Sequence, residues 1–370
     1  MKKALLIVLF IFLFKNNTYA LDTSAESACM IIADTGTVIY DKNAHEKLPM
    51  ASTTKIMTAI LALENSNPYD IVTVSSNAAG QEGSSIYISS GDKIYMNDLL
   101  YGLMLNSGND AAVAIAEFIS GNTDNFAKEM NLLAKKIGAN NTSFQNPNGL
   151  DGSEHYTTAY DLAMITSYAM KNPDFRKIVS TKEKNCALQN GNILYFSNHN
   201  KLLKMYEGTT GVKTGYTKKS GRCLVSAAQK HGIELIAVTL NAPEDWNDHI
   251  TMMDYGFSAT KTVTLANENE PLKTIYTIDN QEIVCLLKDA ITIPVFNNSL
   301  PENEFITHLP QKIVPPLKKG EKIGEANIFI NGKLYKNTDI LCDKDITIQK
   351  KSFKSSIFRV IKRLKKLYLQ

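Results

Sequence analysis

The chain has 370 residues, of which 44% are hydrophobic and 21% are charged, a composition typical of two or three folded domains and not of a disordered protein. The formal net charge of +3 is unevenly spread, because residues 350–370 carry eight lysines and arginines and residues 1–20 carry three lysines, with no acid in either. The rest of the chain therefore has a net charge of −8, which argues against nucleic acid as a partner.

Residues 1–20 have the pattern of a secretory signal peptide. Two lysines precede an unbroken apolar run from Ala4 to Phe14, and polar, small or neutral residues lead to Ala20. The apolar run is too short to span a bilayer comfortably. We therefore expect cleavage after Ala20 and export of the chain, with a retained membrane anchor as the alternative.

Residues 21–259 predict one α+β domain, in which helices pack on an antiparallel sheet. Two β-rich runs joined around Asp34-Thr35-Gly36 predict a hairpin. Apolar periodicity then predicts a series of helices and, later, three successive antiparallel strands. The predicted helices begin near Ser52 and cover 96–104, 111–119, 126–137, about 158–170 and 249–257, and the later strands cover 211–215, 222–228 and 233–240.

Residues 260–347 show short alternating runs broken by Pro, Asn and Asp, which predict a small all-β domain without catalytic features. Residues 348–370 predict a basic amphipathic helix. Such a helix can lie in an anionic membrane surface, where each basic residue contributes about 1 kcal/mol. A disordered basic tail is the alternative. The apolar positions at helical spacing are Phe353, Ile357, Val360, Ile361, Leu364, Leu367 and Tyr368.

Five cysteines are an odd number, and no two stand in a Cys-x-x-Cys pair. This usage predicts neither a disulfide framework nor a zinc site. Cys29 and Cys223 lie in apolar runs typical of strands, where a thiol usually serves as a small buried hydrophobe. We expect no metal and no cofactor.

The first candidate for chemistry is the pair Ser52 and Lys55, which directly precedes apolar residues at helical spacing. Residues three apart lie on one face of a helix, so the hydroxyl and the amine would be neighbours, as a nucleophile and its base must be. A Ser-x-x-Lys tetrad also occurs by chance, however, and a serine here can simply cap a helix.

Two further motifs make this pair more specific. Ser107-Gly108-Asn109 falls in a tight turn between two predicted helices, and Lys213-Thr214-Gly215 falls near the end of the first later strand. The ordered set Ser-x-x-Lys, Ser-x-Asn and Lys-Thr-Gly occurs in penicillin-binding proteins and class A β-lactamases.

The runs around these motifs resemble the low-molecular-weight D-alanyl-D-alanine carboxypeptidases, which are penicillin-binding proteins. The resemblance covers roughly residues 25–260, and the β-rich domain with its basic tail is also similar to that family's layout. It implies a penicillin-binding, β-lactamase-like transpeptidase fold followed by a small all-β domain. The runs that carry it are 47–52, 107–112, 146–150, 155–159, 211–217 and 254–257.

The resemblance implies a serine-type enzyme that removes the terminal D-alanine from peptidoglycan stem peptides through an acyl-enzyme on Ser52. It also implies covalent inhibition by β-lactams and a place on the outer face of the cytoplasmic membrane, held there by the C-terminal helix. The expected partners are thus stem peptides ending in D-Ala-D-Ala, β-lactams and the membrane surface.

The residues support this chemistry on physical grounds. No histidine triad is apparent, so Lys55 must be neutral to take the proton of Ser52. The positive end of its own helix, the nearby cation of Lys213 and desolvation would all lower the pKa of Lys55. Ser107 then fits a proton relay to the leaving amine, and Asn109 fits an orienting amide.

The expected substrate-binding residues are Lys213, Thr214, Gly215 and Tyr216. Lys213 and Thr214 suit the terminal carboxylate through charge and a hydroxyl donor. The resemblance implies that the backbone N–H groups of Ser52 and Tyr216 form an oxyanion hole. The strand that carries these residues can pair with an extended peptide.

Two positions depart from the family's pattern. Asn148 stands where relatives often have histidine, and residues 242–248 contain no arginine where some relatives have one that helps with the carboxylate. Arg222 is the nearby candidate for that role, with an exposed strand-end charge as the alternative. Three other polar residues are interpreted as structural: His155, Asp161 and His199.

A serine β-lactamase, a D,D-endopeptidase and a noncatalytic cell-wall-binding protein remain as alternatives. Class A β-lactamases use a glutamate followed four residues later by asparagine, and no glutamate between the second and third motifs is followed in that way. The presence of all three motifs argues against a protein that has lost its activity.

Overall fold

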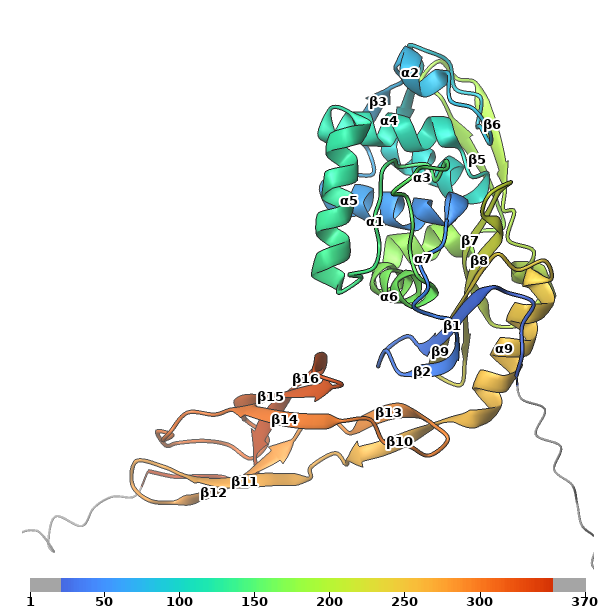
Figure 1. The fold of residues 1–370 in the computed structure, drawn as a ribbon. Helices are drawn as coiled ribbons and strands as arrows, with labels where there is room; N and C mark the ends of the chain where they lie inside the picture. The colour runs from blue at the N-terminus through green and yellow to red at the C-terminus, as the bar shows by residue number, and fades with distance from the viewer. Residues whose placement is uncertain (1–20, 349–370) are drawn as a thin grey trace, which may run out of the picture.

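In the computed structural model, which describes residues 21–348, a five-stranded antiparallel sheet runs through the larger, N-terminal domain (Figure 1). The strand order β2-β1-β9-β8-β7 pairs the predicted first hairpin with the three predicted later strands, and β7 lies at an edge. The strands are β1 (Ser27–Ile32), β2 (Val38–Lys42), β7 (Thr209–Thr217), β8 (Gly221–Lys230) and β9 (Ile233–Leu240).

Helices cover both faces of this sheet. Alternate residues of β1 serve the two sides: Ile31 joins the core formed with the helices between β2 and β7, whereas Met30 joins a smaller core with Met252 of the last helix. The helices are α1 (Lys55–Asn65), α2 (Ser76–Ala79), α3 (Met96–Leu105), α4 (Asn109–Ser120), α5 (Thr123–Ile137), α6 (Ala159–Met170), α7 (Pro173–Ser180), α8 (Leu202–Met205) and α9 (Asp245–Ala259).

The predicted helices correspond to α1, α3, α4, α5, α6 and α9, with ends that differ by up to four residues, and α2 was not predicted. Thr158 caps α6, since its Oγ1 accepts a hydrogen bond from the Asp161 N–H at 3.0 Å. The residues from Ala51 to Thr54 form a 3₁₀ turn, η1, and α1 itself begins at Lys55. The sequence did not predict α7, α8 or the exposed hairpin of β5 (Glu183–Ala187) and β6 (Ile193–Ser197); β3 (Ile71–Thr73) and β4 (Lys93–Tyr95) form another small ribbon.

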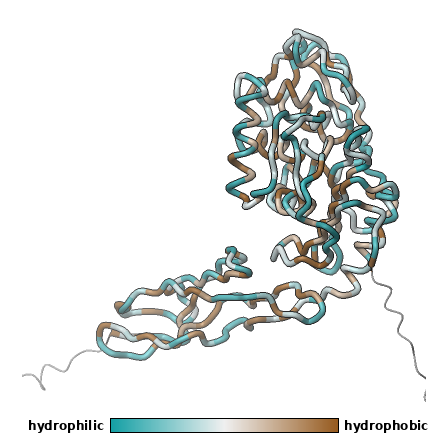
Figure 2. The backbone as a smooth tube through the Cα atoms, in the orientation of Figure 1, coloured by the Kyte–Doolittle hydropathy of each residue, from teal (hydrophilic) through white to brown (hydrophobic). Residues whose placement is uncertain are grey.

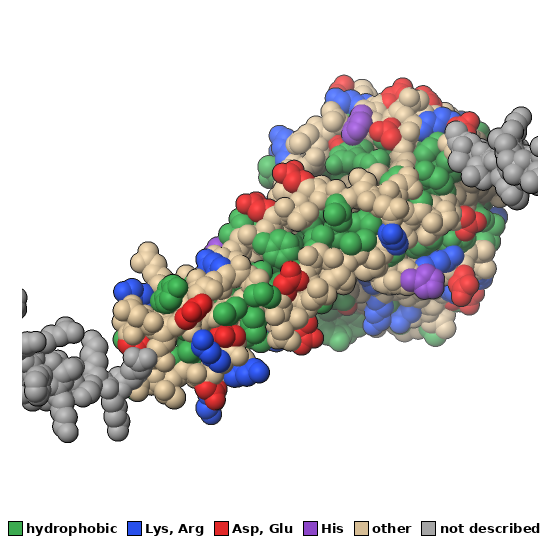
Figure 3. Space-filling model, turned by 90° about the horizontal axis from the view of Figure 1, so that it is seen from below, with side chains coloured by type: hydrophobic (Ala, Val, Ile, Leu, Met, Phe, Trp, Pro, Cys, Tyr) green, Lys and Arg blue, Asp and Glu red, His purple; other side chains and the backbone are tan. Residues whose placement is uncertain are grey.

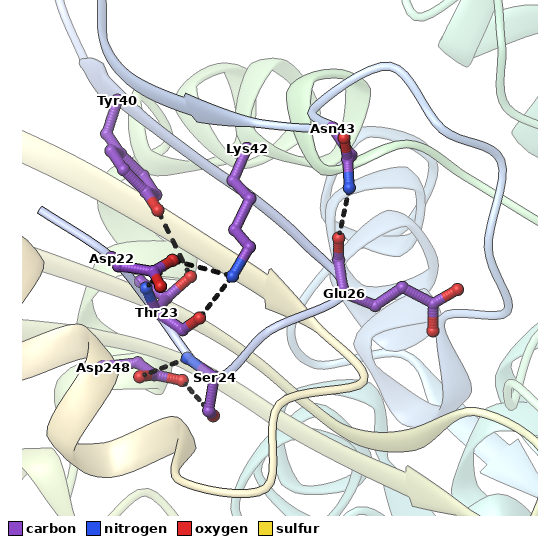
Figure 4. A network of polar contacts seen from close by, with 8 residues as sticks. All are labelled: Asp22, Thr23, Ser24, Glu26, Tyr40, Lys42, Asn43 and Asp248. Carbon is purple, nitrogen blue, oxygen red and sulfur yellow. Dashed lines mark hydrogen bonds and ion pairs between the residues drawn. The ribbon is translucent and has the colours of Figure 1, made fainter.

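The first described residues are fixed to the sheet and to α9 (Figure 4). The Lys42 amine donates to the Asp22 carboxylate at 2.8 Å, and both the backbone N–H and the hydroxyl of Ser24 donate to the Asp248 carboxylate at 2.9 and 2.7 Å. The Asn43 amide donates to the Glu26 carbonyl at 3.0 Å. The chain is thus held in place directly before β1 begins.

The C-terminal domain is all-β, as predicted, and follows α9 directly (Figure 1). A two-stranded ribbon pairs β10 with β13, and a separate sheet has the order β11-β12-β16-β15-β14. Buried hydrophobic residues form a core in each domain, and Figure 2 shows hydrophobic and hydrophilic stretches alternating along the backbone of both. The strands are β10 (Thr260–Ala266), β11 (Pro271–Tyr276), β12 (Glu282–Leu287), β13 (Ile291–Phe296), β14 (Asn303–His308), β15 (Lys322–Ile330) and β16 (Lys333–Cys342).

The two domains meet in a few side-chain contacts. The rings of Tyr255 and Phe296 lie 5.9 Å apart, and the Asn331 amide donates to the Thr35 carbonyl at 3.3 Å. No helix within residues 21–348 is long and apolar enough to cross a membrane. The predicted signal peptide and nearly all of the predicted C-terminal helix lie outside the described residues.

Candidate active site

The turn η1 places Ser52 and Lys55 side by side. Ala51, directly before Ser52, has a positive φ of 47°, which L-residues rarely adopt. The Lys55 amine lies 2.9 Å from the Ser52 hydroxyl. Ser52 does not cap α1, since neither η1 nor α1 has a side-chain cap. The capping alternative is therefore wrong, and the Ser52 hydroxyl instead interacts with the Lys55 amine.

Lys55 is fully buried among oxygen atoms. Its Nζ donates to Asn109 Oδ1 at 2.6 Å and to the Asn148 carbonyl at 2.5 Å. Burial lowers the pKa of Lys55 well below its usual value of 10.5, and the cation of Lys213 lowers it further, against the opposing effect of Asp110. A neutral amine has two N–H donors and one lone pair, which match two carbonyl acceptors and one hydroxyl donor. The site thus suits a neutral Lys55 that accepts the proton of Ser52.

The second motif lies in the turn between α3 and α4, as predicted. Ser107 has a positive φ of 63°, is 4% exposed and lines the same cavity as Ser52. The Asn109 amide is fixed from both ends, because its oxygen accepts from Lys55 and its nitrogen donates to the Glu82 carbonyl at 2.6 Å. The Asn109 amide oxygen is thus held in place where it contacts the Lys55 amine.

Asp110 is a supporting residue that sequence reasoning missed. Its buried carboxylate accepts hydrogen bonds from the Ser85 hydroxyl at 2.6 Å and from the Ile86 and Ile88 backbone N–H groups at 3.0 and 3.3 Å. These bonds hold the loop that brings Ser84 to the cavity wall. The available signal was an acid directly after the second motif, but an acid in the first turn of a helix is also an ordinary helix-stabilising residue.

The third motif lies on the edge strand β7, close to the turn that carries the nucleophile. Lys213 is 1% exposed, its Nζ donates to the Thr214 carbonyl at 2.9 Å, and burial lowers its pKa to about 7. Gly215 lies so close to η1 that a Cβ there would be 3.1 Å from the Ser52 nitrogen. A side chain there would require η1 to shift by a few tenths of an ångström, so glycine favours this close approach of the strand to the nucleophile.

A cavity of about 340 Å³ opens between the three motifs. Five of the predicted site residues line it: Ser52, Ser107, Thr214, Gly215 and Tyr216. His199, which we interpreted as structural, and Arg222 line it as well, whereas Lys55, Asn109 and Lys213 are not among the lining residues. The Arg222 guanidinium donates to the buried Asp245 carboxylate at 2.7 Å and lies 5.9 Å from the Trp246 ring centre. The full lining is Ser52, Ser84, Ser107, His199, Lys201, Thr214, Gly215, Tyr216, Arg222, Asp245 and Trp246.

The loop around Asn148 closes the inner side of the site. Its carbonyl accepts from Lys55, and its side-chain amide donates to Gln81 at 3.2 Å. Gly149 has a φ of +91°, and a Cβ there would be 2.0 Å from the Ala51 carbonyl oxygen. The loop therefore packs against the nucleophile's own backbone and contributes a backbone oxygen to the site.

Two of the residues interpreted as structural hold loops in place. His155 lies 2.8 Å from the Thr54 hydroxyl and accepts from the Gln145 N–H at 3.0 Å. Burial lowers the pKa of His155 to about 4, so the ring is neutral. Asp161 accepts from the Asn141 N–H at 2.7 Å. Residues 21–348 contain no cluster of three His, Cys, Asp or Glu side chains suited to a metal ion.

Two protein-family models match this chain. A family model described as Peptidase_S11, D-alanyl-D-alanine carboxypeptidase, matches residues 15–244, and one described as the C-terminal domain of penicillin-binding protein 5 matches residues 260–347. The chain is 34% identical over 340 residues to DacF of Bacillus subtilis, covering 89% of this chain and 87% of DacF. It is 30% identical to DacC of Escherichia coli, covering 91% and 90%.

Two solved structures are similar, one over most of this chain and the other over about two thirds of it. DacD of Francisella tularensis superposes with a TM-score of 0.64 at 26% identity, covering 89% of this chain and 95% of DacD. The DD-transpeptidase of Streptomyces K15 superposes with a TM-score of 0.61 at 35% identity and covers 64% of this chain and 98% of its own.

Proposed function

The chain belongs to the Peptidase_S11 family of D-alanyl-D-alanine carboxypeptidases, and from this premise we propose that it removes the terminal D-alanine of peptidoglycan stem peptides through an acyl-enzyme on Ser52. The buried Lys55 amine supports the roles of Ser52 as nucleophile and Lys55 as base, because it contacts two carbonyl oxygens and the Ser52 hydroxyl. A nucleophile and a neutral base in this geometry perform acyl transfer.

The reaction follows from the positions of the groups. Lys55 takes the proton of Ser52 as Oγ attacks the carbonyl of the penultimate D-alanine, and Ser107 passes a proton to the departing amine as the C–N bond breaks. We assign the oxyanion hole to the backbone N–H groups of Ser52 and Tyr216. The close packing of Gly215 on η1, which brings β7 beside the Ser52 nitrogen, supports this assignment. Water then hydrolyses the ester and restores Ser52.

We propose that the substrate lies along β7 as an added strand. β7 is an edge of the sheet, so the backbone groups on its outer side are available to an extended peptide. The terminal carboxylate then meets Lys213 and Thr214. A β-lactam that acylates Ser52 occupies the same place, which explains covalent inhibition.

The direct test of this function is product analysis of a synthetic peptide ending in D-Ala-D-Ala. We expect mass spectrometry to show release of one D-alanine, and fluorescent penicillin to remain bound as a long-lived adduct. Rapid hydrolysis of penicillin without release of D-alanine would instead identify a β-lactamase. Cleavage of cross-linked peptide dimers alone would identify an endopeptidase.

We further propose that Arg222 assists in binding the substrate carboxylate. Its guanidinium faces the cavity, and the buried Asp245 carboxylate fixes its position. In R222L we expect the KM for a D-Ala-D-Ala peptide to rise roughly tenfold, as for the loss of a hydrogen bond to a charged group. The control is the same peptide with a C-terminal amide, on which both proteins should have equal KM. Equal effects on both peptides would contradict a role in carboxylate binding.

Attachment to the membrane through the predicted helix of residues 348–370 is also a proposal, because all but the first of these residues lie outside the described structure. The end of the C-terminal domain supports it. Ile278 N–H donates to the Ile313 carbonyl at 2.9 Å, and the Gln281 amide donates to the Thr347 carbonyl at 2.7 Å, so three segments meet where the described chain ends. Hydrophobic side chains gather in patches among charged ones on the underside of the molecule (Figure 3). Independently of that view, the exposed large hydrophobic residues in or beside the three segments are Tyr276, Ile278, Val314 and Ile348.

Deleting residues 350–370 is expected to move the exported protein from the membrane fraction to the soluble fraction, with activity on a soluble peptide unchanged. Replacing Ile357 and Leu364 with serine keeps every positive charge and should also release the protein, because insertion of the apolar face is lost. Cell fractionation with immunoblotting measures both. Undiminished membrane association of the deletion variant would contradict the proposal.

A further inference from the structure

Two of the five cysteines face each other across the C-terminal sheet. Cys285 lies on β12 and Cys342 on β16, and the two are direct partners in the antiparallel register. The other three cysteines have no such partner: Cys29 lies opposite Asp41 and Val238, Cys186 opposite Leu194, and Cys223 opposite Gly215. All five carry free thiols in the structure.

The hydrogen-bond pattern shows which type of pair this is. The Lys288 N–H donates to the Asp339 carbonyl at 3.0 Å, so Lys288 and Asp339 form a hydrogen-bonded pair. Hydrogen-bonded and non-hydrogen-bonded pairs alternate along an antiparallel pair of strands. The pair Cys285–Cys342 is the third pair after Lys288–Asp339. The two cysteines therefore form a non-hydrogen-bonded pair. In agreement, the Cys342 N–H points the other way and donates to the Glu321 carbonyl at 2.9 Å.

This pair type has the geometry that a disulfide needs. Directly opposite residues in non-hydrogen-bonded pairs have Cα atoms about 4.5 Å apart, within the range of about 4.4–6.8 Å found for disulfides. Both side chains point to the same face of the sheet, into the domain core, where Cys285 and Cys342 are 0% and 1% exposed. No change of strand register is required to join the two sulfurs.

The bond would reinforce the shortest strand pairing of this sheet, that of β12 with β16. β12 pairs with β16 only from Cys285 to Leu287, whereas β15 pairs with β16 along nearly their whole lengths. The short pairing of β12 with β16 joins the β11–β12 hairpin to the other three strands. A covalent link at the pair Cys285–Cys342 would thus connect the two halves of the sheet.

We propose that Cys285 and Cys342 form a structural disulfide when the chain folds in the presence of a low-molecular-weight disulfide such as oxidised glutathione. One cysteine thiolate attacks the oxidant, forming a mixed disulfide and releasing one thiolate. The second cysteine thiolate then attacks the protein sulfur and releases the other. The two cysteines lose two electrons and two protons in total, and the oxidant is reduced to two thiols.

The burial of both thiols determines when this happens. Burial raises the pKa of Cys285 to about 11 and also raises the pKa of Cys342, so few thiolates are present in the folded domain at neutral pH. The bond therefore forms during folding, before the sheet closes, and the folded reduced protein is slow to oxidise.

The test is to refold the full chain from urea with a mixture of reduced and oxidised glutathione, block free thiols with iodoacetamide and digest it without reduction. We expect a trypsin product joining Thr274–Lys288 to Asn337–Lys344, with the other three cysteines alkylated. Five alkylated cysteines, or a link between any other pair, would overturn the proposal.

Stability provides a second readout. The oxidised protein should unfold several degrees higher than the reduced protein, because the bond restricts the unfolded chain. In C285S this difference should vanish, whereas C186S should keep it. If C285S does not fold, C285A and C342A serve in its place. An undiminished difference in a folded variant at either position would contradict the assignment.

Discussion

S52A is expected to lose covalent labelling by fluorescent penicillin and to release D-alanine at least on the order of 10⁵-fold more slowly, since removal of a serine nucleophile has effects of that size in other acyl-transfer enzymes. The Ser52 hydroxyl contacts the Lys55 amine at 2.9 Å, and that amine keeps both carbonyl acceptors in the variant. The fold should therefore be unchanged. Gel fluorescence and product mass spectrometry measure the two effects.

The matched control is S258A. Ser258 lies on α9 and is exposed, and its hydroxyl donates to the Tyr255 carbonyl at 2.7 Å, away from the cavity. S258A should be labelled at the wild-type rate. If S52A were still labelled while its circular dichroism matched the wild type, another residue would be the nucleophile.

K55M is expected to slow acylation by about 10³–10⁴-fold, the usual contribution of a general base. Methionine fills similar space but cannot accept the proton of Ser52. K55R should lose as much activity, because a guanidinium keeps its proton at every accessible pH. Stopped-flow measurement of acylation by a chromogenic β-lactam tests both variants, and thermal melting shows whether they fold.

The pH dependence distinguishes a base from a merely structural lysine. Since burial lowers the pKa of Lys55, wild-type acylation should rise as the pH increases through that pKa and the neutral amine forms. Above about pH 7, Lys213 loses its proton in the free enzyme and the affinity for a carboxylate falls. K128M changes an exposed lysine of α5, so it should show the same rise in acylation and the same fall in carboxylate affinity as the wild type. K55R with more than a tenth of wild-type acylation would exclude Lys55 as the base.

The parts of the site that the sequence predicts are those set by local spacing. Ser52 and Lys55 are three residues apart in one helical segment, and the break between two apolar helices indicates the turn that holds Ser107 and Asn109. Lys213 is on a strand, as its alternating run predicts. These three segments also carry the family resemblance.

The parts that the sequence did not predict depend on contacts between distant segments. The Asn148 carbonyl supports Lys55 through a backbone oxygen, which any residue would provide, so its side chain gives no signal. His199 lines the cavity because the segment after β6 lies beside the same cavity as β8 and α9, and no spacing in the sequence shows this. Arg222 was a candidate from the sequence, but its ion pair with Asp245 is visible only in the fold. The β5–β6 hairpin is largely exposed and mixes charged and apolar residues, so its alternation is weak.

The burial of Lys55 and Lys213 has a consequence for folding equilibrium. Both pKa values lie below 10.5 in the folded protein, so the unfolded chain binds more protons between about pH 7 and pH 10. These lysines therefore lower the free energy of unfolding at neutral pH, and their penalty is relieved as the pH rises. The protein therefore takes up protons when it unfolds in this pH range. Burial of the Lys55 and Lys213 amines thus makes the folded protein less stable than it would be with exposed lysines.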